Sequence, residues 1–216
     1  MLFRKWVNNM YLSRIPLDIN NRKTLRAMSS ASLFHGALEE CFLGERTRKL
    51  WRIDCLGGKE YFMLLSEEQP DLTSFCRQFS YTDDCWETKN YNLLLDKLEN
   101  GGVWRFRLTA NPTKSDLSKG DGKRGKVVPH VTTAYQKKWL LERAEKHGFV
   151  LAENSFDIVE SKWKRFYKKG NHTVTILSVS YEGILTITDA SLFKEMLKVG
   201  IGRGKAYGMG LMTVIR

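Results

Sequence analysis

The chain has 216 residues, of which 42% are apolar, enough to bury the core of one large domain or two small ones. Its 35 lysines and arginines outnumber 24 aspartates and glutamates, and the formal charge of +11 favours a polyanionic partner over a small neutral substrate. No apolar run approaches the roughly 20 residues that span a bilayer, and residues 1–9 lack the apolar core of a signal peptide. We therefore expect a cytoplasmic protein that binds nucleic acid and no membrane.

The first part of the chain, residues 10–100, has the predicted order β-α-β-β-α-β. Alternating apolar residues predict strands, and a stripe that includes Phe34, Leu38 and Phe42 predicts a helix. The predicted elements are strands at 11–17, 50–55, 61–65 and 86–91 and helices at 31–42 and 72–79, with a hairpin turn at Gly57–Gly58. This order is that of a ferredoxin-like unit.

Residues 101–216 repeat the order after a turn at Asn100–Gly102. The predicted elements are a strand at 103–110, a basic loop, a helix at about 133–146, strands near 149–159 and 174–187, a helix at 190–198 and a terminal strand at 211–215. We therefore predict an α+β fold of two tandem ferredoxin-like, RRM-like domains, 10–100 and 101–216. The strand signature of the standard RNA-recognition sheet is missing, so RNA contacts are expected from loops, a hairpin and helix ends.

The densest cluster of cations lies in the segment Ser161–Gly170. Five positive charges alternate with Trp163, Phe166 and Tyr167, as in a hairpin that holds phosphates while its rings stack or pack. The alternative is a solvated hairpin whose aromatic residues belong to the core. The RNA-binding candidates from this segment are Lys162, Lys164, Arg165, Lys168 and Lys169.

A basic segment, Asn111–Lys126, and the glycine-rich segment Gly200–Leu211 also fit a phosphate-bearing partner. Glycine permits left-handed dihedrals and close approach of the backbone to a ligand. The glycine-rich segment lacks the Lys-Ser or Lys-Thr pair of a P-loop and the downstream helix of a dinucleotide fingerprint. Its structural alternative is a bulge or close packing of a strand on a helix. The candidates from these segments and the helix at 133–146 are Lys114, Lys123, Arg124, Lys126, Arg143, Gly202, Arg203, Gly204, Lys205 and Gly208.

His35 is the candidate for proton transfer. It lies early in a predicted helix, after Ser29 and Ser30 as capping residues, and on the flank of the apolar stripe. The helix's positive end favours a neutral ring that accepts a proton, and the alternative is a structural or exposed histidine.

No metal or cofactor is expected. The acidic pairs Glu39–Glu40 and Asp83–Asp84 lack the partners of a two-metal nuclease. The cysteines show no C-x-x-C spacing and no nearby histidine pair, so we expect neither a zinc site nor disulfides but buried thiols at Cys41, Cys55, Cys76 and Cys85.

Motifs spread from Met10 almost to the end of the chain form a specific set. They are M-Y-L-S-R at Met10–Arg14, F-H-G at Phe34–Gly36, L-W-R-I-D at Leu50–Asp54, R-F-R-L-T-A-N-P-T-K at Arg105–Lys114, Y-E-G-I-L-T-I-T-D at Tyr181–Asp189 and the spaced glycines at Gly200, Gly202, Gly208 and Gly210. With this set the chain resembles the CRISPR-associated repeat endoribonuclease of type I-E Cascade systems, the CasE family. Residues 1–9 fall outside the resemblance.

The resemblance implies two ferredoxin-like folds that bind the CRISPR repeat stem-loop in precursor crRNA and cut at its 3′ base. It implies cleavage without metal and in a single turnover, leaving a 2′,3′-cyclic phosphate and a 5′-hydroxyl. The protein, a monomer when free, is then expected to stay on the mature crRNA stem-loop beside the other Cascade subunits.

His35 falls where the family carries its catalytic histidine. The histidine either takes the 2′-OH proton or gives one to the departing oxygen, and we favour the first role. Three residues earlier the family carries a tyrosine, but this chain has Ser32. The second catalytic role is therefore open to Ser32, Tyr207, Lys205 or another cation.

Two alternatives from other functional classes remain. A catalytically silent RNA-binding subunit of the same complex would keep the basic hairpin and the glycine-rich segment but not cut RNA. An assembly protein would use its basic surface to dock on partner subunits, which leaves the glycine-rich segment unexplained.

Overall fold

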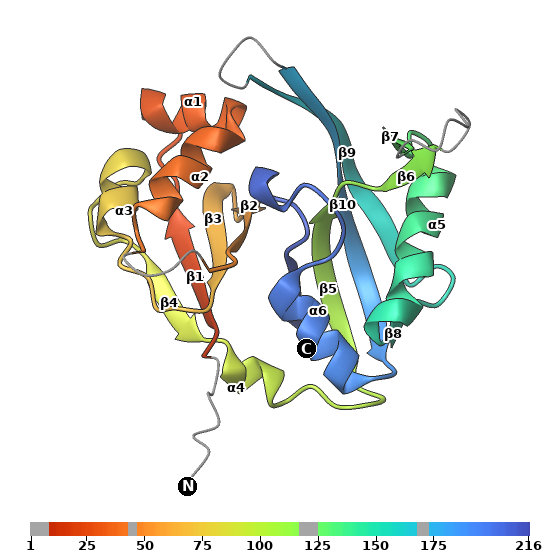
Figure 1. The fold of residues 1–216 in the computed structure, drawn as a ribbon. Helices are drawn as coiled ribbons and strands as arrows, with labels where there is room; N and C mark the ends of the chain where they lie inside the picture. The colour runs from red at the N-terminus through yellow and green to blue at the C-terminus, as the bar shows by residue number, and fades with distance from the viewer. Residues whose placement is uncertain (1–8, 43–46, 117–124, 168–172) are drawn as a thin grey trace, which may run out of the picture.

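Two main antiparallel sheets, each with helices packed on it, and one two-stranded sheet make up the described fold (Figure 1). The computed structural model describes residues 9–42, 47–116, 125–167 and 173–216. The predictions for Lys123, Arg124, Lys168 and Lys169 therefore lie outside the described residues, as do residues 1–8.

The first sheet has the strand order β2-β3-β1-β4, with antiparallel neighbours throughout. The hairpin between β2 and β3 turns at Gly57 and Gly58, where φ is +58° and +76°. The elements are β1 (Tyr11–Pro16), α1 (Arg22–Ser29), α2 (Ala31–Glu39), β2 (Leu50–Leu56), β3 (Lys59–Ser66), α3 (Thr73–Phe79), β4 (Glu87–Asn90) and α4 (Asn92–Leu95).

The second sheet has the order β11-β5-β10, and both β8 and β9 pair with the other edge of β10. The elements are β5 (Val103–Ala110), β6 (Thr113–Asp116), β7 (Lys126–Pro129), α5 (Thr133–Ala144), the 3-10 turn η1 (Glu145–His147), β8 (Phe149–Val150), β9 (Phe156–Tyr167), β10 (Thr173–Ile187), α6 (Ala190–Val199), the 3-10 turn η2 (Lys205–Tyr207) and β11 (Met212–Ile215). Each sheet thus has the strand order of a ferredoxin-like unit, and the predicted α+β class is confirmed. The domain boundary at residue 100 stays a prediction.

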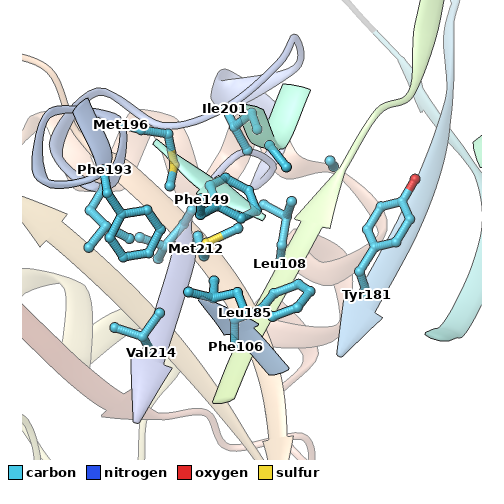
Figure 2. Close-up of a cluster of buried hydrophobic side chains, with 14 of the residues drawn as sticks. Phe106, Leu108, Phe149, Tyr181, Leu185, Phe193, Met196, Ile201, Met212 and Val214 are labelled. Carbon is cyan, nitrogen blue, oxygen red and sulfur yellow. The ribbon is translucent and has the colours of Figure 1, made fainter. Parts of the chain in front are cut away.

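The core of the second unit lies between its sheet and the helices α5 and α6. Phe149 and Phe193 meet edge to face with 5.5 Å between ring centroids. Figure 2 shows the buried side chains of this cluster, among them Phe106, Leu108, Phe149, Tyr181, Leu185, Phe193, Met196, Ile201, Met212 and Val214. Under α2 and α3 a second cluster packs aromatic rings, including Phe34, Trp51, Phe62, Phe75 and Phe79.

Arg52 of β2 joins the two sheets. Its side chain is 2% exposed and donates to the backbone oxygens of Arg107, at 3.0 Å, and Leu211, at 2.7 Å. It also forms two 2.7 Å bonds to the carboxylate of Asp54 and a 2.9 Å bond to the hydroxyl of Thr213. Arg107 belongs to β5 of the second sheet, and Leu211 directly precedes β11. These bonds therefore fix how the two sheets face each other.

Several elements differ from the sequence-based prediction, among them α4, which was not predicted. Helix α1 was not predicted, although it is amphipathic; its buried residues are the small side chains Thr24 and Ala27, and Met28 is the larger apolar residue that packs from the same face. The segment expected as a basic loop forms the β6–β7 hairpin at its described ends. The strand expected at 149–159 is two strands, and the second, β9, continues to Tyr167 through the basic segment.

The cysteine prediction is half wrong. Cys41 and Cys76 are buried, but Cys55 is exposed and Cys85 is partly exposed. Cys55 lies near the end of β2, next to the turn at Gly57, where the sheet is no longer covered. All four thiols are free.

Candidate nucleic-acid interface and active centre

The glycine-rich segment forms a closed loop between α6 and β11. All five of its glycines have positive φ, between +74° and +88°. Its ends are joined by a bond from Ile201 N to Gly210 O at 3.0 Å, and Gly210 N donates to Thr109 O on β5 at 2.7 Å. The loop is therefore anchored to the centre of the second sheet.

Close packing also constrains several of these glycines, two of them against tryptophan rings. A Cβ on Gly208 would lie 2.5 Å from Trp51 Cζ3, and one on Gly202 would lie 3.0 Å from Trp139 Cζ2. Both tryptophans are buried. Gly202 and Gly208 thus have a structural role, the alternative that the sequence left open, because the loop must lie against these rings.

Gly208→Ala is expected to cost about 1 to 3 kcal/mol more free energy of unfolding than Gly58→Ala. The two glycines share a φ of +76°, so alanine strains both backbones alike, by about 1 to 2 kcal/mol. Only Gly208 faces a neighbour, since nothing lies within 4 Å of a Cβ on Gly58. Urea unfolding of the two variants measures the difference. Equal losses would mean that Trp51 moves aside at no cost.

The loop borders three depressions. Gly208 lines a groove of about 640 Å³ between the sheets, here called the inter-sheet groove. Gly202 lines a pocket of about 260 Å³, the basic pocket. Ala206 lines a cleft of about 750 Å³ that contains His35, the His35 cleft. The loop is thus the structure that these three spaces have in common.

The described cations of the basic hairpin line the inter-sheet groove. Lys162, Lys164 and Arg165 of β9 all line it. Burial, with a smaller contribution from Lys162, lowers the pKa of Lys164, so this ammonium is partly desolvated. Lys162 is paired with Glu160 at 2.7 Å.

The aromatic residues of this hairpin divide between core and surface. Phe166 is buried and stacks on Tyr207 of the glycine loop, with 5.2 Å between centroids. Trp163 is 53% exposed. The core interpretation therefore fits Phe166, while the ring of Trp163 is accessible to a stacking partner.

The His35 cleft contains a short chain of charged groups. His35 lies in α2, 34% exposed, with its Nδ1 3.9 Å from Oε1 of Glu39. The other oxygen of Glu39 accepts a 3.3 Å bond from Lys49, whose ammonium is 4.4 Å from the ring centre of Phe42. The cleft's further charged residues are Arg48, Glu67, Glu195 and Lys198.

Ser32 does not line the His35 cleft. It lines a different depression, and its hydroxyl lies 3.1 Å from that of Ser30. Burial lowers the pKa of Lys205. The charge of Arg48, a residue that lines the His35 cleft, lowers it further.

Sequence reasoning missed Glu39, Lys49 and Lys198 as neighbours of His35. Glu39 was considered only as half of an acidic pair. The signal that identifies it is its spacing of four residues from His35, which puts both side chains on one face of a helix. Lys49 and Lys198 come from other parts of the chain, and no local pattern connects them with α2.

Three of the remaining predicted RNA-binding residues, Lys114, Arg143 and Arg203, line the basic pocket. Lys126 is exposed on β7. Gly204 has a φ of +87° and precedes η2.

In the described part of the chain, no three histidine, cysteine, aspartate or glutamate side chains are grouped to hold a metal ion. Nor is any helix of that part long and apolar enough to cross a membrane.

Comparison with known proteins identifies the family. A family model described as CRISPR associated protein matches residues 10–216. The CRISPR-associated endoribonuclease Cse3 of Thermus thermophilus is 27% identical over 220 residues, covering 95% of this chain and 99% of Cse3. The Cascade subunit CasE of Escherichia coli is 33% identical over 125 residues, 55% of this chain and 60% of CasE.

The fold agrees with this match. The structure of T. thermophilus Cse3 bound to an RNA representing a pre-cleavage complex superposes with a TM-score of 0.83 at 25% identity, covering 96% of this chain and 100% of that one. Cas6e of E. coli shares the fold with a TM-score of 0.65 at 24% identity. Because the family match extends over residues 10–216, the chain belongs to the CRISPR-associated protein family, and its resemblance to the type I-E CasE-like endoribonucleases is confirmed.

Proposed function

We propose that the protein is a metal-independent endoribonuclease that binds the CRISPR repeat stem-loop in precursor crRNA. It cuts at the 3′ base of the hairpin and then stays on the mature crRNA as a Cascade subunit. The observation that carries this proposal is that the glycine loop borders both the cleft of His35 and the inter-sheet groove, whose lining includes Lys162, Lys164 and Arg165. The similarity to an endoribonuclease over almost the whole chain supports it.

The chemistry that fits is attack by the RNA's own 2′-OH. A base removes the 2′-OH proton, O2′ bonds to phosphorus, and the bond from phosphorus to O5′ breaks while O5′ takes a proton. The products are a 2′,3′-cyclic phosphate and a 5′-hydroxyl. The protein therefore has to align the phosphate, move two protons and stabilise the charge that develops on the phosphate.

His35 is the proposed base. Glu39 lies on the Nδ1 side of the ring and favours the tautomer with the proton on Nδ1, which leaves Nε2 to accept the proton of the 2′-OH. Neither Ser32 nor Lys205 lines the His35 cleft, so the second role stays a prediction for both. Burial and the charge of Arg48 lower the pKa of Lys205, which makes its ammonium a stronger acid.

The test is single-turnover cleavage of the repeat stem-loop RNA in EDTA. We expect a cut that leaves a 2′,3′-cyclic phosphate, detected by mass spectrometry, and no cut when the nucleotide before the scissile phosphate is 2′-deoxy. RNA that is bound but never cut would indicate a silent subunit instead. Cleavage of the deoxy substrate would contradict 2′-OH attack.

Stem-loop binding is expected to depend strongly on salt, because the groove cations neutralise RNA phosphates. Lys164→Gln and Arg165→Gln should each flatten the slope of log affinity against log salt by roughly 0.7 to 0.9. The control is Lys97→Gln, which removes the same charge at an exposed position after α4. A slope that falls equally in all three variants would contradict the groove as the RNA-binding surface.

A further inference from the structure

The basic pocket brings together cations from three distant segments of the chain. Lys114 comes from β6, Arg143 from α5 and Arg203 from the glycine loop, and all three line one space of about 260 Å³. A backbone bridge between Asn111 and Arg203 fixes the loop to the chain that leads into β6. The convergence is therefore built into the backbone.

The pocket carries surplus positive charge. Among its lining residues the one carboxylate is Glu142, which lies 4.0 Å from Lys138, outside the pocket. Within the described ranges, Lys114, Arg143 and Arg203 form no ion pair. The described lining of the pocket thus has three cations and one carboxylate, and that carboxylate, Glu142, also lies near Lys138.

A buried residue of the pocket wall carries a hydrogen-bond donor without a partner in the described structure. Trp139 is 1% exposed, lines the pocket, and its indole Nε1 has no hydrogen-bond partner among the residues that the structure describes. Arg143 covers its ring, with the guanidinium carbon 4.2 Å from the centroid, and donates to Trp139 O at 3.3 Å. A buried donor without a partner is rare in folded proteins and fits a site that an acceptor fills.

The surroundings are partly desolvated. Burial lowers the pKa of Arg143, and burial together with the charges of Lys114 and Arg143 lowers the pKa of His130, another lining residue. An anion beside Arg143 therefore gains more from that cation than it does in water.

We propose that the basic pocket holds a phosphate group of the RNA backbone, with Lys114 and Arg203 supplying charge and the indole N–H of Trp139 supplying a hydrogen bond. A phosphate matches both features, because it is anionic and presents several acceptor oxygens. The RNA backbone is the source that the geometry favours, since the glycine loop borders this pocket as well as the groove and the His35 cleft. That the phosphate comes from RNA rests on the proposed function. That the pocket binds a phosphate does not rest on it.

The first arm of the test measures RNA binding. Lys114→Gln and Arg203→Gln alter exposed side chains, so both variants are expected to fold. Each should weaken stem-loop affinity by about tenfold and flatten the salt slope by roughly 0.7 to 0.9. Lys97→Gln is the control, because Figure 1 shows α4, which precedes Lys97, at the opposite end of the molecule from β6.

The second arm follows the indole N–H of Trp139 by ¹H–¹⁵N NMR of the full chain, the signal being assigned from its loss in Trp139→Phe. Inorganic phosphate and the stem-loop RNA should each shift this signal in the parent protein, and Arg203→Gln should reduce both shifts. An indole signal that neither ligand moves would overturn the proposal.

The two arms separate the possible failures. If phosphate shifts the indole signal but Lys114→Gln and Arg203→Gln bind RNA like Lys97→Gln, the pocket takes an anion from another source and the proposal is wrong. If the parent does not bind the stem-loop at all, the proposed function fails, and the phosphate titration alone then decides whether the pocket binds an anion.

Discussion

His35→Ala is expected to slow single-turnover cleavage of the repeat stem-loop by about 10² to 10⁴, which corresponds to about 2.7 to 5.5 kcal/mol of barrier. A group that transfers a proton acts in the transition state, so its loss affects the chemical step. Affinity for the stem-loop should change little, because the cations that we propose to hold phosphates line the inter-sheet groove and the basic pocket, away from His35. Cleavage rate and equilibrium binding are measured on the same variant.

Ser32→Ala is the matched variant for this measurement. Ser32 and His35 lie three residues apart in α2, but only His35 lines the cleft. We therefore expect Ser32→Ala to slow cleavage far less than His35→Ala. If His35→Ala cuts at the parental rate, the active centre is elsewhere. If Ser32→Ala is as slow as His35→Ala, the serine has the role of the family's tyrosine after all.

The parts of the fold that the sequence predicts are those with a local period. Strands such as β1, β3 and β5 alternate, and the amphipathic helices α2, α5 and α6 carry a stripe of apolar residues, so each was expected close to its observed bounds. The β6–β7 hairpin was missed because its strands have four residues each and β6 is polar throughout. Their pairing depends on cross-strand bonds between residues that are ten or more positions apart.

In the candidate site, too, only the residues that a local pattern marks could be predicted from the sequence. His35 and the basic segment in β9 are visible because a residue type or a charge density marks them locally. The neighbours of His35 are visible only where helical spacing implies them, as for Glu39, and not where tertiary packing brings them, as for Lys49. The pocket around Trp139 depends on three segments that meet only in the fold.

Arg52→Met is expected to lower the free energy of unfolding by about 3 to 5 kcal/mol, because it removes one partner of a buried ion pair. Asp54, 4% exposed, would keep only the 3.1 Å contact with Arg107, and the backbone oxygens of Arg107 and Leu211 would lose their donor. Urea unfolding measures the loss. The pairing of the sheets would weaken with it, since these bonds connect β2 to the second sheet.

The matched control is Arg14→Met. Arg14 also binds a carboxylate through two bonds, both 3.0 Å to Glu87, but the two side chains are 42% and 61% exposed. Such a surface pair contributes about 0 to 1 kcal/mol, so the difference between the variants reports burial rather than the contact itself. Equal losses would contradict the role of Arg52. Adding Asp54→Leu to Arg52→Met should recover part of the stability, because it removes the carboxylate that the first change leaves buried with a single partner.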